Sequence, residues 1–314
     1  FSADCLREAL STMRTGRAPG PDGLPYEWYA AFWDAGVGDA MAAALNEAYA
    51  SDGEAAVPAL PASMREGLIV LLYKGDEQPR ADPASYRPIT LLNSDYKILA
   101  KALVRRWSAL ADAVVDATQS AFLPGRWIGD NILFHLEELD YCAATQQTGC
   151  ILFLDWAKAY DRLDQDWLLM VMERMGFSAP SRRWARMMVS GMRGRVLNAG
   201  YRSPTFSVFS GLAQGSPLSP LLYLLAAQPL SARLRQLQRD GTLAGIRMPD
   251  GSLGPPCCMH ADDTTLHVAH VPAAKVALEQ AVTPFARASA AQLQMRKVKG
   301  MLIGRHAGFE GVVH

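Results

Sequence analysis

Two adjacent carboxylates, Asp262 and Asp263, are the residues of this chain best suited to metal-dependent chemistry. They interrupt a run of mostly apolar or β-favouring residues that extends from Cys257 to Val268. The run predicts a β-hairpin with the acidic pair at its tight turn, where aspartate is tolerated. Two like charges this close are unfavourable without a cation, so a divalent metal is the natural ligand. An isolated Asp-Asp pair is also common in surface turns, so the interpretation depends on the other residues.

Asp155 is the third candidate carboxylate, because it follows a run of four hydrophobic residues, 151–154. Such a run predicts a strand buried on both faces. If this strand and the hairpin are neighbours in one antiparallel sheet, the three carboxylates converge. They can then hold two divalent ions about 3.5–4 Å apart, one lowering the pKa of an attacking hydroxyl and the other stabilising the leaving oxygens. Polymerases and nucleases share this chemistry, so the carboxylates alone do not separate them.

Two cations border a predicted loop that suits a polyphosphate. Residues 68–73 predict a buried strand, and the polar segment that follows lies between Lys74 and Arg87. A loop closed by two cations can clamp phosphate oxygens, although two solvated charges are the simpler interpretation.

A glycine-containing loop precedes the most apolar predicted helix. Gln214 and Gly215 are followed by Ser216, which suits an N-cap, and by Pro217, which suits the first helical position. The helix predicted for 218–230 is apolar nearly all round and therefore central. The loop before it can approach a planar or phosphate ligand closely, with Gln214 at its mouth, but as a helix start this pattern is common.

The other elements follow from periodicity and from glycine and proline. The loop 16–25 is too rich in both for regular structure. Asp164 is predicted to cap a helix that Gly176 ends. The further predicted elements are helices over 4–14, 26–50, 93–115 and 276–293, a loop over 119–131 with a helix after it through Cys142, a hairpin over 196–208 turning at 198–200, and an edge strand over 301–303.

Length and charge bound the class of protein. The chain has 314 residues, half of them hydrophobic, which exceeds the usual single-domain size and predicts two lobes. The 31 basic and 31 acidic residues give a formal net charge of zero. This balance argues against a strong nucleic-acid binder unless the charges are segregated. They partly are, because basic residues cluster within 7–17, 97–106 and 182–195.

Five cysteines without Cys-x-x-Cys spacing predict reduced core thiols and an intracellular protein. The sequence contains no signal peptide and no apolar run of 18 residues, so we expect a soluble protein without membrane partners. Because the chain begins at Phe1 rather than Met, we expect it to be a piece of a longer protein.

Five segments follow one another in a specific order: Tyr86-Arg87-Pro88-Ile89, Gln119-Ser120-Ala121-Phe122 with Arg126, Phe153-Leu154-Asp155 with Ala159-Tyr160-Asp161, Gln214-Gly215-Ser216-Pro217-Leu218-Ser219-Pro220, and Ala261-Asp262-Asp263. This order resembles the reverse transcriptase domain of non-long-terminal-repeat (LINE-type) retrotransposons, with group II intron and telomerase enzymes as more distant relatives. The loop 18–23 looks like the N-terminal extension motif of that family. The resemblance spans residues 16–303.

The resemblance implies an α+β fold of the right-hand polymerase type, with fingers and a palm whose antiparallel sheet packs on helices. It places the N-terminal extension and fingers in 1–148 and the palm in 149–314, with a finger-side insertion at about 165–210. A thumb and an endonuclease are not included in these residues and are expected elsewhere in a longer polyprotein.

The resemblance also implies roles for individual residues. Asp155 and Asp262 look like the principal ligands of two Mg²⁺ ions, with Mn²⁺ as an alternative, and Asp263 like the supporting carboxylate. Tyr160 falls where the family places a steric gate against the ribose 2′-hydroxyl. Residues implied to contact the incoming nucleotide are Lys74 and Arg87 at the triphosphate, Gln214 and Gly215 beside the nucleotide and template base, and Lys299 near the leaving pyrophosphate.

We therefore expect an enzyme that copies an RNA template into DNA from the 3′-hydroxyl of a DNA primer or target, with dNTPs as substrates, serving retrotransposition and acting in the nucleus. His260 stands where the family usually has Tyr or Phe. It can hydrogen-bond the primer backbone, or it can weaken activity by adding charge at lower pH. Two alternatives remain open: a catalytically silent copy that only binds RNA, and a metal-dependent nuclease, which gives no reason for Tyr160, Gln214 and the finger cations.

Overall fold

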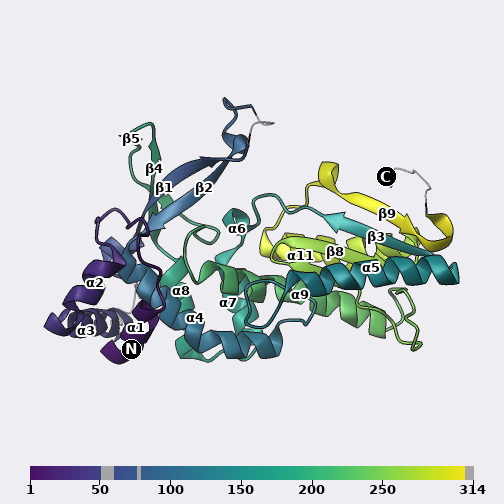
Figure 1. Cartoon of the computed structure of the whole chain (residues 1–314), viewed down its shortest axis with the longest axis horizontal. Helices are drawn as coiled ribbons and strands as arrows, with labels where there is room; N and C mark the ends of the chain where they lie inside the picture. Colours follow the sequence, from purple (N-terminus) through teal and green to yellow (C-terminus); the bar gives the residue numbers. More distant parts are fainter. Residues whose placement is uncertain (51–59, 76–78, 308–314) are drawn as a thin grey trace. The chain divides into compact units, whose positions relative to one another are not determined.

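The chain forms two compact units, each assembled from two segments (Figure 1). The computed structural model describes residues 1–50, 60–75 and 79–307. Unit 1 consists of Phe1–Ala109 and Met172–Ser219, and unit 2 consists of Leu110–Val171 and Pro220–His314. Two lobes were predicted from the length of the chain, and in this division the second unit begins at Leu110.

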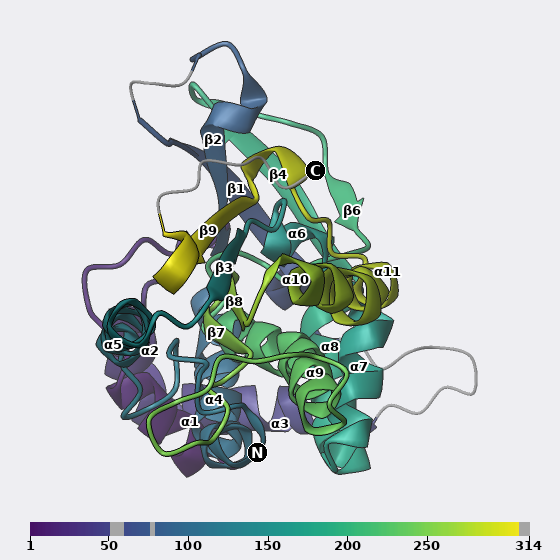
Figure 2. The same cartoon turned by 90° about the vertical axis from the view of Figure 1, so that its right-hand side faces the viewer.

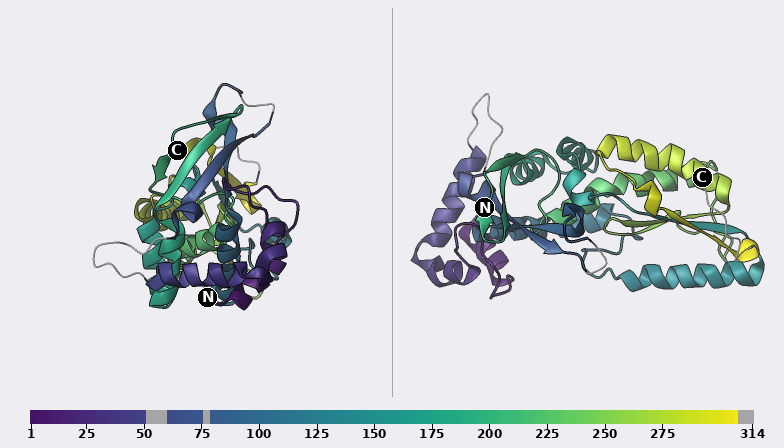
Figure 3. Two further views of the ribbon diagram at one scale, coloured as in Figure 1. Left: turned by 90° about the vertical axis from the view of Figure 1, so that its left-hand side faces the viewer. Right: turned by 90° about the horizontal axis from the view of Figure 1, so that it is seen from above.

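Unit 1 combines N-terminal helices with a five-stranded sheet. Its sheet has the order β2-β1-β4-β5, with β6 paired to β4; β1 and β2 are antiparallel, whereas β1 and β4 are parallel. The left view of Figure 3 shows β1, β2 and β4 side by side. Its elements are α1 (Ala3–Ser11), α2 (Tyr26–Phe32), η1 (Trp33–Ala35), α3 (Val37–Ala50), η2 (Ala62–Arg65), β1 (Glu66–Tyr73), η3 (Pro83–Ser85), β2 (Tyr86–Leu92), most of α4 (Ser94–Val114), α8 (Ala179–Val189), β4 (Met192–Asn198), β5 (Tyr201–Arg202) and β6 (Phe206–Val208).

Most of the elements predicted for unit 1 are present, with local differences. The helix predicted over 26–50 is interrupted at Gly36, whose φ of 103° ends η1 before α3 begins. The strand over 68–73 was predicted to be buried. Only its first half is buried, and Leu72 in its second half is 53% exposed. The hairpin between β4 and β5 turns at Ala199 and Gly200, whose φ angles of 48° and 84° match the left-handed pair of a type I′ turn.

Unit 2 contains a four-stranded sheet in the order β7-β8-β3-β9, and all of its neighbouring strands are antiparallel. Figure 2 shows α5 on one face of this sheet and α9, α10 and α11 on the other. Its elements are α5 (Ile128–Thr145), β3 (Gly149–Leu154), α6 (Ala159–Arg162), α7 (Gln165–Arg174, which continues into unit 1), α9 (Ser219–Arg239), β7 (Cys257–His260), β8 (Asp263–Val268), α10 (Val271–Ala277), the π-helical turn η4 (Leu278–Val282), α11 (Thr283–Ser289), η5 (Met295–Lys297), β9 (Lys299–Ile303) and η6 (Gly304–His306).

Alternation along β3 and β8 divides the core of unit 2 between the two faces of the sheet. Leu152 is paired with Leu266 on one face, and Ile151 is paired with His267 on the other. Ile151 packs with Cys142 of α5 and with Ile303 in one hydrophobic cluster, so the His267 face is the one that α5 covers. The edge strand predicted for 301–303 is β9, and Asp164 caps α7 as predicted by accepting from the Trp167 amide at 2.7 Å.

Two helices of unit 2 differ from prediction in their ends. The central helix α9 continues beyond residue 230 to Arg239, and the helix predicted over 276–293 is divided by a π-helical turn and ends at Ser289. Among the described residues, none of the helices combines the length and the apolar character that crossing a bilayer requires.

Candidate active site

The β7–β8 hairpin holds the acidic pair, as predicted. His260 is paired with Asp263, so the two-residue turn consists of Ala261 and Asp262. Ala261 has a φ of 57°, the left-handed conformation that primed hairpin turns require at their first central position. Asp262 therefore lies in the turn itself, whereas Asp263 is the first residue of β8 and is exposed.

The register of the sheet brings Asp155 to the same end as this pair. Leu154 of β3 is the partner of Thr264, so Asp155 follows at the level of Asp263. Burial raises the pKa of Asp262 above its ordinary value, and the negative charges of Asp263 and Asp155 raise it further. The three carboxylates are therefore close enough to repel one another, which is the convergence that the sequence required.

These carboxylates suit divalent cations. They offer hard oxygen donors, the ligands that Mg²⁺ prefers, and Asp155 keeps 38% of its side chain exposed. Their mutual repulsion is the energetic cost that a bound cation removes. Lys297 contacts one of them, with its Nζ 3.3 Å from Asp155 Oδ2. From the sequence, Lys299 was predicted to lie near the leaving pyrophosphate. In the structure Lys299 is exposed in β9, where its backbone is paired with Phe153.

Gln119 fixes the backbone immediately before Asp262. Its Oε1 accepts from the Ala261 amide at 2.8 Å, and its Nε2 donates to the Ala261 carbonyl at 3.3 Å. The Gln119 side chain is buried, and the next amide, Ser120 N, donates to Met259 O at 2.9 Å. A two-sided contact of this kind holds the left-handed Ala261 in place. From the sequence, Gln119 was predicted to begin the loop 119–131, and no role was predicted for its side chain.

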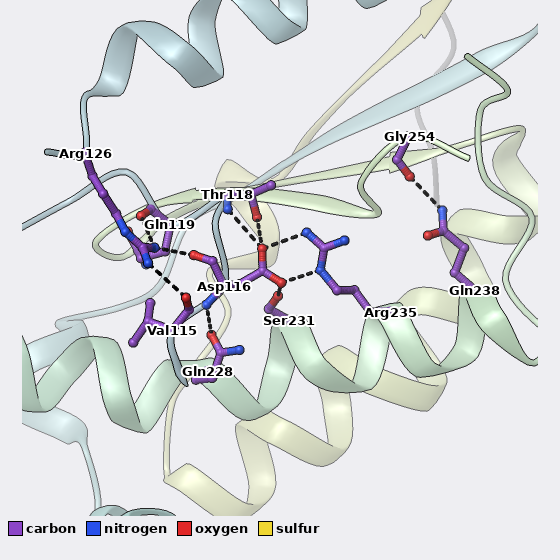
Figure 4. Close-up of polar contacts among 10 residues, drawn as sticks. All are labelled: Val115, Asp116, Thr118, Gln119, Arg126, Gln228, Ser231, Arg235, Gln238 and Gly254. Carbon is purple, nitrogen blue, oxygen red and sulfur yellow. Dashed lines mark hydrogen bonds and ion pairs between the residues drawn. The ribbon is translucent and has the colours of Figure 1, made fainter. Parts of the chain in front are cut away.

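A half-buried ion pair anchors the loop that contains Gln119 (Figure 4). Asp116 accepts from Arg235 of α9 through both carboxylate oxygens, with Nη2–Oδ1 at 2.7 Å, and also from Ser231 at 2.8 Å. The Thr118 amide donates to the same carboxylate at 2.9 Å. Burial alone raises the pKa of Asp116, but these hydrogen bonds outweigh it and lower the pKa to about 2. Asp116 is therefore ionised and firmly paired.

Arg126 fastens the other end of this loop. It donates to the carbonyls of Val115 and Gln119, both at 3.0 Å, and forms an ion pair with Asp112 at 2.8 Å. The sequence analysis noted Arg126 only as part of a motif and did not single out Asp116. The available signal was on α9, where the polar residues Gln228, Ser231 and Arg235 lie at spacings of three and four and so share one face of the helix.

Tyr160, the predicted steric gate, lies beside the carboxylates. Its ring stacks on that of Tyr223 of α9, with centroids 4.8 Å apart and an interplanar angle of 17°. Burial raises the pKa of both phenols, and the charge of Asp262 raises both further. Sequence analysis missed Tyr223, because it stands within a run of leucines that predicts only a core helix.

The other predicted nucleotide contacts belong to unit 1. Lys74 follows β1 and Arg87 lies in β2, so both are on one hairpin, and both are exposed. Lys74 Nζ donates to the Ala84 carbonyl at 2.6 Å. The tip of this hairpin includes residues outside the described part of the chain.

Gln214 and Gly215 lie against β2 of the same unit. The Thr90 amide donates to the Gln214 carbonyl at 2.6 Å. Gly215 has a φ of 122°, and a Cβ there would lie 2.4 Å from the Thr90 carbonyl oxygen, so only glycine fits. Unit 1 therefore brings Gln214 and Gly215 to the strand that contains Arg87, whereas Asp155, Tyr160, Asp262, Asp263 and Lys299 belong to unit 2.

Comparisons with known proteins identify the family of this chain. A family model described as "Reverse transcriptase (RNA-dependent DNA polymerase)" matches residues 74–312. The "Transposon TX1 uncharacterized 149 kDa protein" of Xenopus laevis is 31% identical over 309 residues, which cover 97% of this chain and 22% of that protein. The "Probable RNA-directed DNA polymerase from transposon X-element" of Drosophila melanogaster is 29% identical over 174 residues, covering 52% of this chain and 18% of that protein. The chain thus spans about a fifth of the length of these relatives.

A solved structure shows the fold. The fold of the chain is similar to that of "apo telomerase from Candida Tropicalis truncated from C-terminal domain", with a TM-score of 0.56, 13% sequence identity, and coverage of 80% of this chain and 51% of that one. This likeness confirms the predicted α+β fold of a right-hand polymerase.

Proposed function

Because the chain belongs to the reverse transcriptase family, we propose that it extends the 3′-hydroxyl of a DNA primer with deoxynucleotides on an RNA template. The family match also confirms the resemblance to non-long-terminal-repeat retrotransposons, whose proteins are among the relatives. The observation that supports the reaction best is the convergence of Asp155, Asp262 and Asp263 at one end of the unit 2 sheet, with the charge of Asp262 also acting on Tyr160. We propose that this reaction serves retrotransposition and takes place in the nucleus.

The chain is proposed to be divided into fingers and palm. In this assignment the palm is 149–314 with a finger-side insertion at about 165–210, and the N-terminal extension and fingers are 1–148. The grouping of Met172–Ser219 with the N-terminal segment supports the insertion. A thumb and an endonuclease are proposed for other parts of a longer polyprotein, and the short share of each relative that the chain spans supports this.

In this proposal Asp155 and Asp262 are the principal ligands of two Mg²⁺ ions, Asp263 supports them, and Mn²⁺ can substitute. When bound, the ions lower the pKa of the primer hydroxyl and stabilise the oxygens of the leaving pyrophosphate. Gln119 holds the turn that presents Asp262. Lys297 or Lys299 supplies a positive charge near the leaving group, and the contact between Lys297 and Asp155 favours Lys297.

Residues of unit 1 are proposed to bind the incoming nucleotide. Lys74 and Arg87 are exposed cations on one hairpin and suit the triphosphate. Gln214 and Gly215, pressed against β2, suit the nucleotide and the template base.

Primer extension on an RNA template with Mg²⁺ tests the function. The 314-residue chain should incorporate dNTPs, Asp262→Asn should abolish incorporation, and Asp140→Asn, which changes an exposed carboxylate of α5, should leave it unchanged. Degradation of the template without incorporation would instead support a nuclease. Template binding with neither reaction would identify a catalytically silent copy.

Tyr160 gives a test of substrate choice. Tyr160→Ala should raise incorporation of ribonucleotides relative to deoxynucleotides by roughly tenfold or more, because it opens space beside the sugar. Tyr160→Phe keeps the ring and should preserve discrimination, and Tyr201→Ala, at a side chain that is 82% exposed, is a further control. Unchanged discrimination in Tyr160→Ala would remove Tyr160 from the gate role.

A further inference from the structure

Two histidines and a cysteine meet between α5 and the unit 2 sheet. The ligand atoms of His135, Cys258 and His267 all lie within 4.8 Å of one another. Cys258 and His267 are buried, and His135 is half-buried. The three residues come from α5, β7 and β8, and the pairing of Cys258 with Thr265 places them around one point on the sheet face that α5 covers.

Both rings have their Nδ1 atoms committed to acceptors. His267 Nδ1 lies 2.5 Å from Glu138 Oε2, and His135 Nδ1 contacts the Asn131 carbonyl oxygen. An imidazole facing a carboxylate or a carbonyl must carry its proton on that nitrogen. In the neutral ring the other nitrogen, Nε2, then has a lone pair, and both Nε2 atoms contact Thr265 Oγ1.

Among the described residues, the hydroxyl of Thr265 contacts more acceptors than its single hydrogen can serve. Thr265 Oγ1 lies 3.1 Å from His135 Nε2, 3.0 Å from His267 Nε2 and 3.3 Å from the Cys258 carbonyl oxygen. All three partners are acceptors when the rings are neutral, but a hydroxyl has one hydrogen. An electrophile at the centre would satisfy the lone pairs that the hydroxyl does not reach.

Glu138 is a second and independent indication of a missing cation. Its side chain is fully buried, and among the described residues its Oε1 atom has no hydrogen-bond partner. A buried carboxylate with one orphaned oxygen is costly unless positive charge lies nearby. Metal-binding histidines commonly donate their second ring N–H to a carboxylate, which fixes the ring and increases its basicity. The Glu138–His267 contact has this arrangement.

We propose that His135 Nε2, His267 Nε2 and Cys258 Sγ bind a Zn²⁺ ion, with Glu138 orienting His267. Two imidazoles and a thiolate are a ligand set that suits Zn²⁺, with the fourth position open to water. A tetrahedral ion holds such atoms about 3.4–3.7 Å apart, so the side chains must close by about an ångström. Binding deprotonates the Cys258 thiol and releases that proton to solvent.

This site uses nitrogen and sulfur ligands, whereas the catalytic site uses carboxylates, and its expected effect is on stability. The site joins α5 to the β7–β8 hairpin, whose turn contains Asp262. We therefore expect the ion to stabilise unit 2 and not to take part in the reaction. The inference therefore does not depend on polymerase activity.

Cobalt substitution tests the site in the 314-residue chain. Titration with Co²⁺ under reducing conditions should give the near-ultraviolet charge-transfer band of a Co–thiolate bond, saturating at about one ion per chain, and Zn²⁺ should displace it. Cys258→Ala should abolish the band. Cys257→Ala, one residue earlier and therefore facing the opposite side of the sheet, should retain it. Asp262→Asn should also retain it, which excludes the catalytic carboxylates as the source.

Two further variants examine the histidines. His135→Ala, at a half-buried position on α5, should lower the affinity for Co²⁺ by at least tenfold. Glu138→Gln should keep the band and weaken the affinity roughly 10- to 100-fold, as expected of a group that orients a ligand.

The wild-type spectrum alone decides the proposal if a variant does not fold. Absence of the charge-transfer band in wild-type chain with excess Co²⁺ would overturn the site and leave a buried imidazolium–glutamate pair in its place. Persistence of the band in folded Cys258→Ala would overturn it as well.

Discussion

Asp116 and Asp262 are aspartates of the same unit, in segments joined by the Gln119 side chain, and their surroundings are opposite. Asp116 is paired with Arg235 and accepts further hydrogen bonds, which lower its pKa to about 2. Asp262 has two carboxylates for neighbours, and burial together with their charges raises its pKa. The chain neutralises one buried acid and leaves the other uncompensated. Asp116 therefore contributes to stability, whereas Asp262 costs stability in exchange for a site that attracts cations.

The largest expected effect comes from removing the uncompensated charge. Asp262→Asn should reduce primer extension by about 10³-fold or more, because it removes a principal metal ligand. Its free energy of unfolding at pH 7 without divalent ions should be equal to or higher than that of the wild type. The sign follows from the raised pKa, since ionisation of Asp262 opposes folding at pH values above that pKa. A marked loss of stability, measured by chemical denaturation, would show that Asp262 has a structural role.

The opposite result is expected at the neutralised acid. Asp116→Asn should lower the free energy of unfolding by about 2 kcal/mol, because Arg235 loses its partner while the amide keeps some hydrogen bonds. The folded pKa of about 2 lies below the ordinary value of 3.8, so this stabilisation is complete above pH 3.8 and is lost as the pH falls towards 2. Denaturation curves of both proteins between pH 7 and 2 measure it. A difference that stays constant down to pH 2 would contradict this assignment.

A variant of Gln119 tests whether the loop that Asp116 anchors also holds the turn containing Asp262. Gln119→Ala should lower kcat about tenfold, with a smaller change in KM, because the turn presenting Asp262 loses both contacts to Ala261. Gln280→Ala, at an exposed position of the same unit, is the matched control. If Gln119→Ala changes stability but leaves kcat intact, the turn is held by the strands alone.

The smallest effect on stability is expected at the exposed pair of Lys297 and Asp155. Lys297→Ala should change the free energy of unfolding by less than about 0.5 kcal/mol, since the Lys297 side chain is 59% exposed and that of Asp155 is 38% exposed. Comparing Lys297→Ala with Lys299→Ala in single-turnover primer extension identifies the lysine that assists the leaving group. We expect the larger decrease for Lys297, and a larger decrease for Lys299→Ala would restore the choice made from sequence.

Local patterns accounted for most of the secondary structure. Hydrophobic runs and turn residues predicted β3, the β7–β8 hairpin and the Asp164 cap, because each depends on neighbours within a few positions. The same patterns failed where the environment decides. They predicted that β1 is buried, although its second half is largely exposed. They also predicted that the last long helix continues beyond Ser289, where it ends.

By itself the sequence determined the three carboxylates, their order with the other motifs and therefore the family. The tertiary structure decided which residues serve them and where a second cation can bind. Gln119 meets Ala261 across 142 positions, and Glu138 meets His267 across 129. Periodicity in a sequence reports only contacts between near neighbours along the chain, whereas these contacts exist because α5, α9 and the sheet pack together.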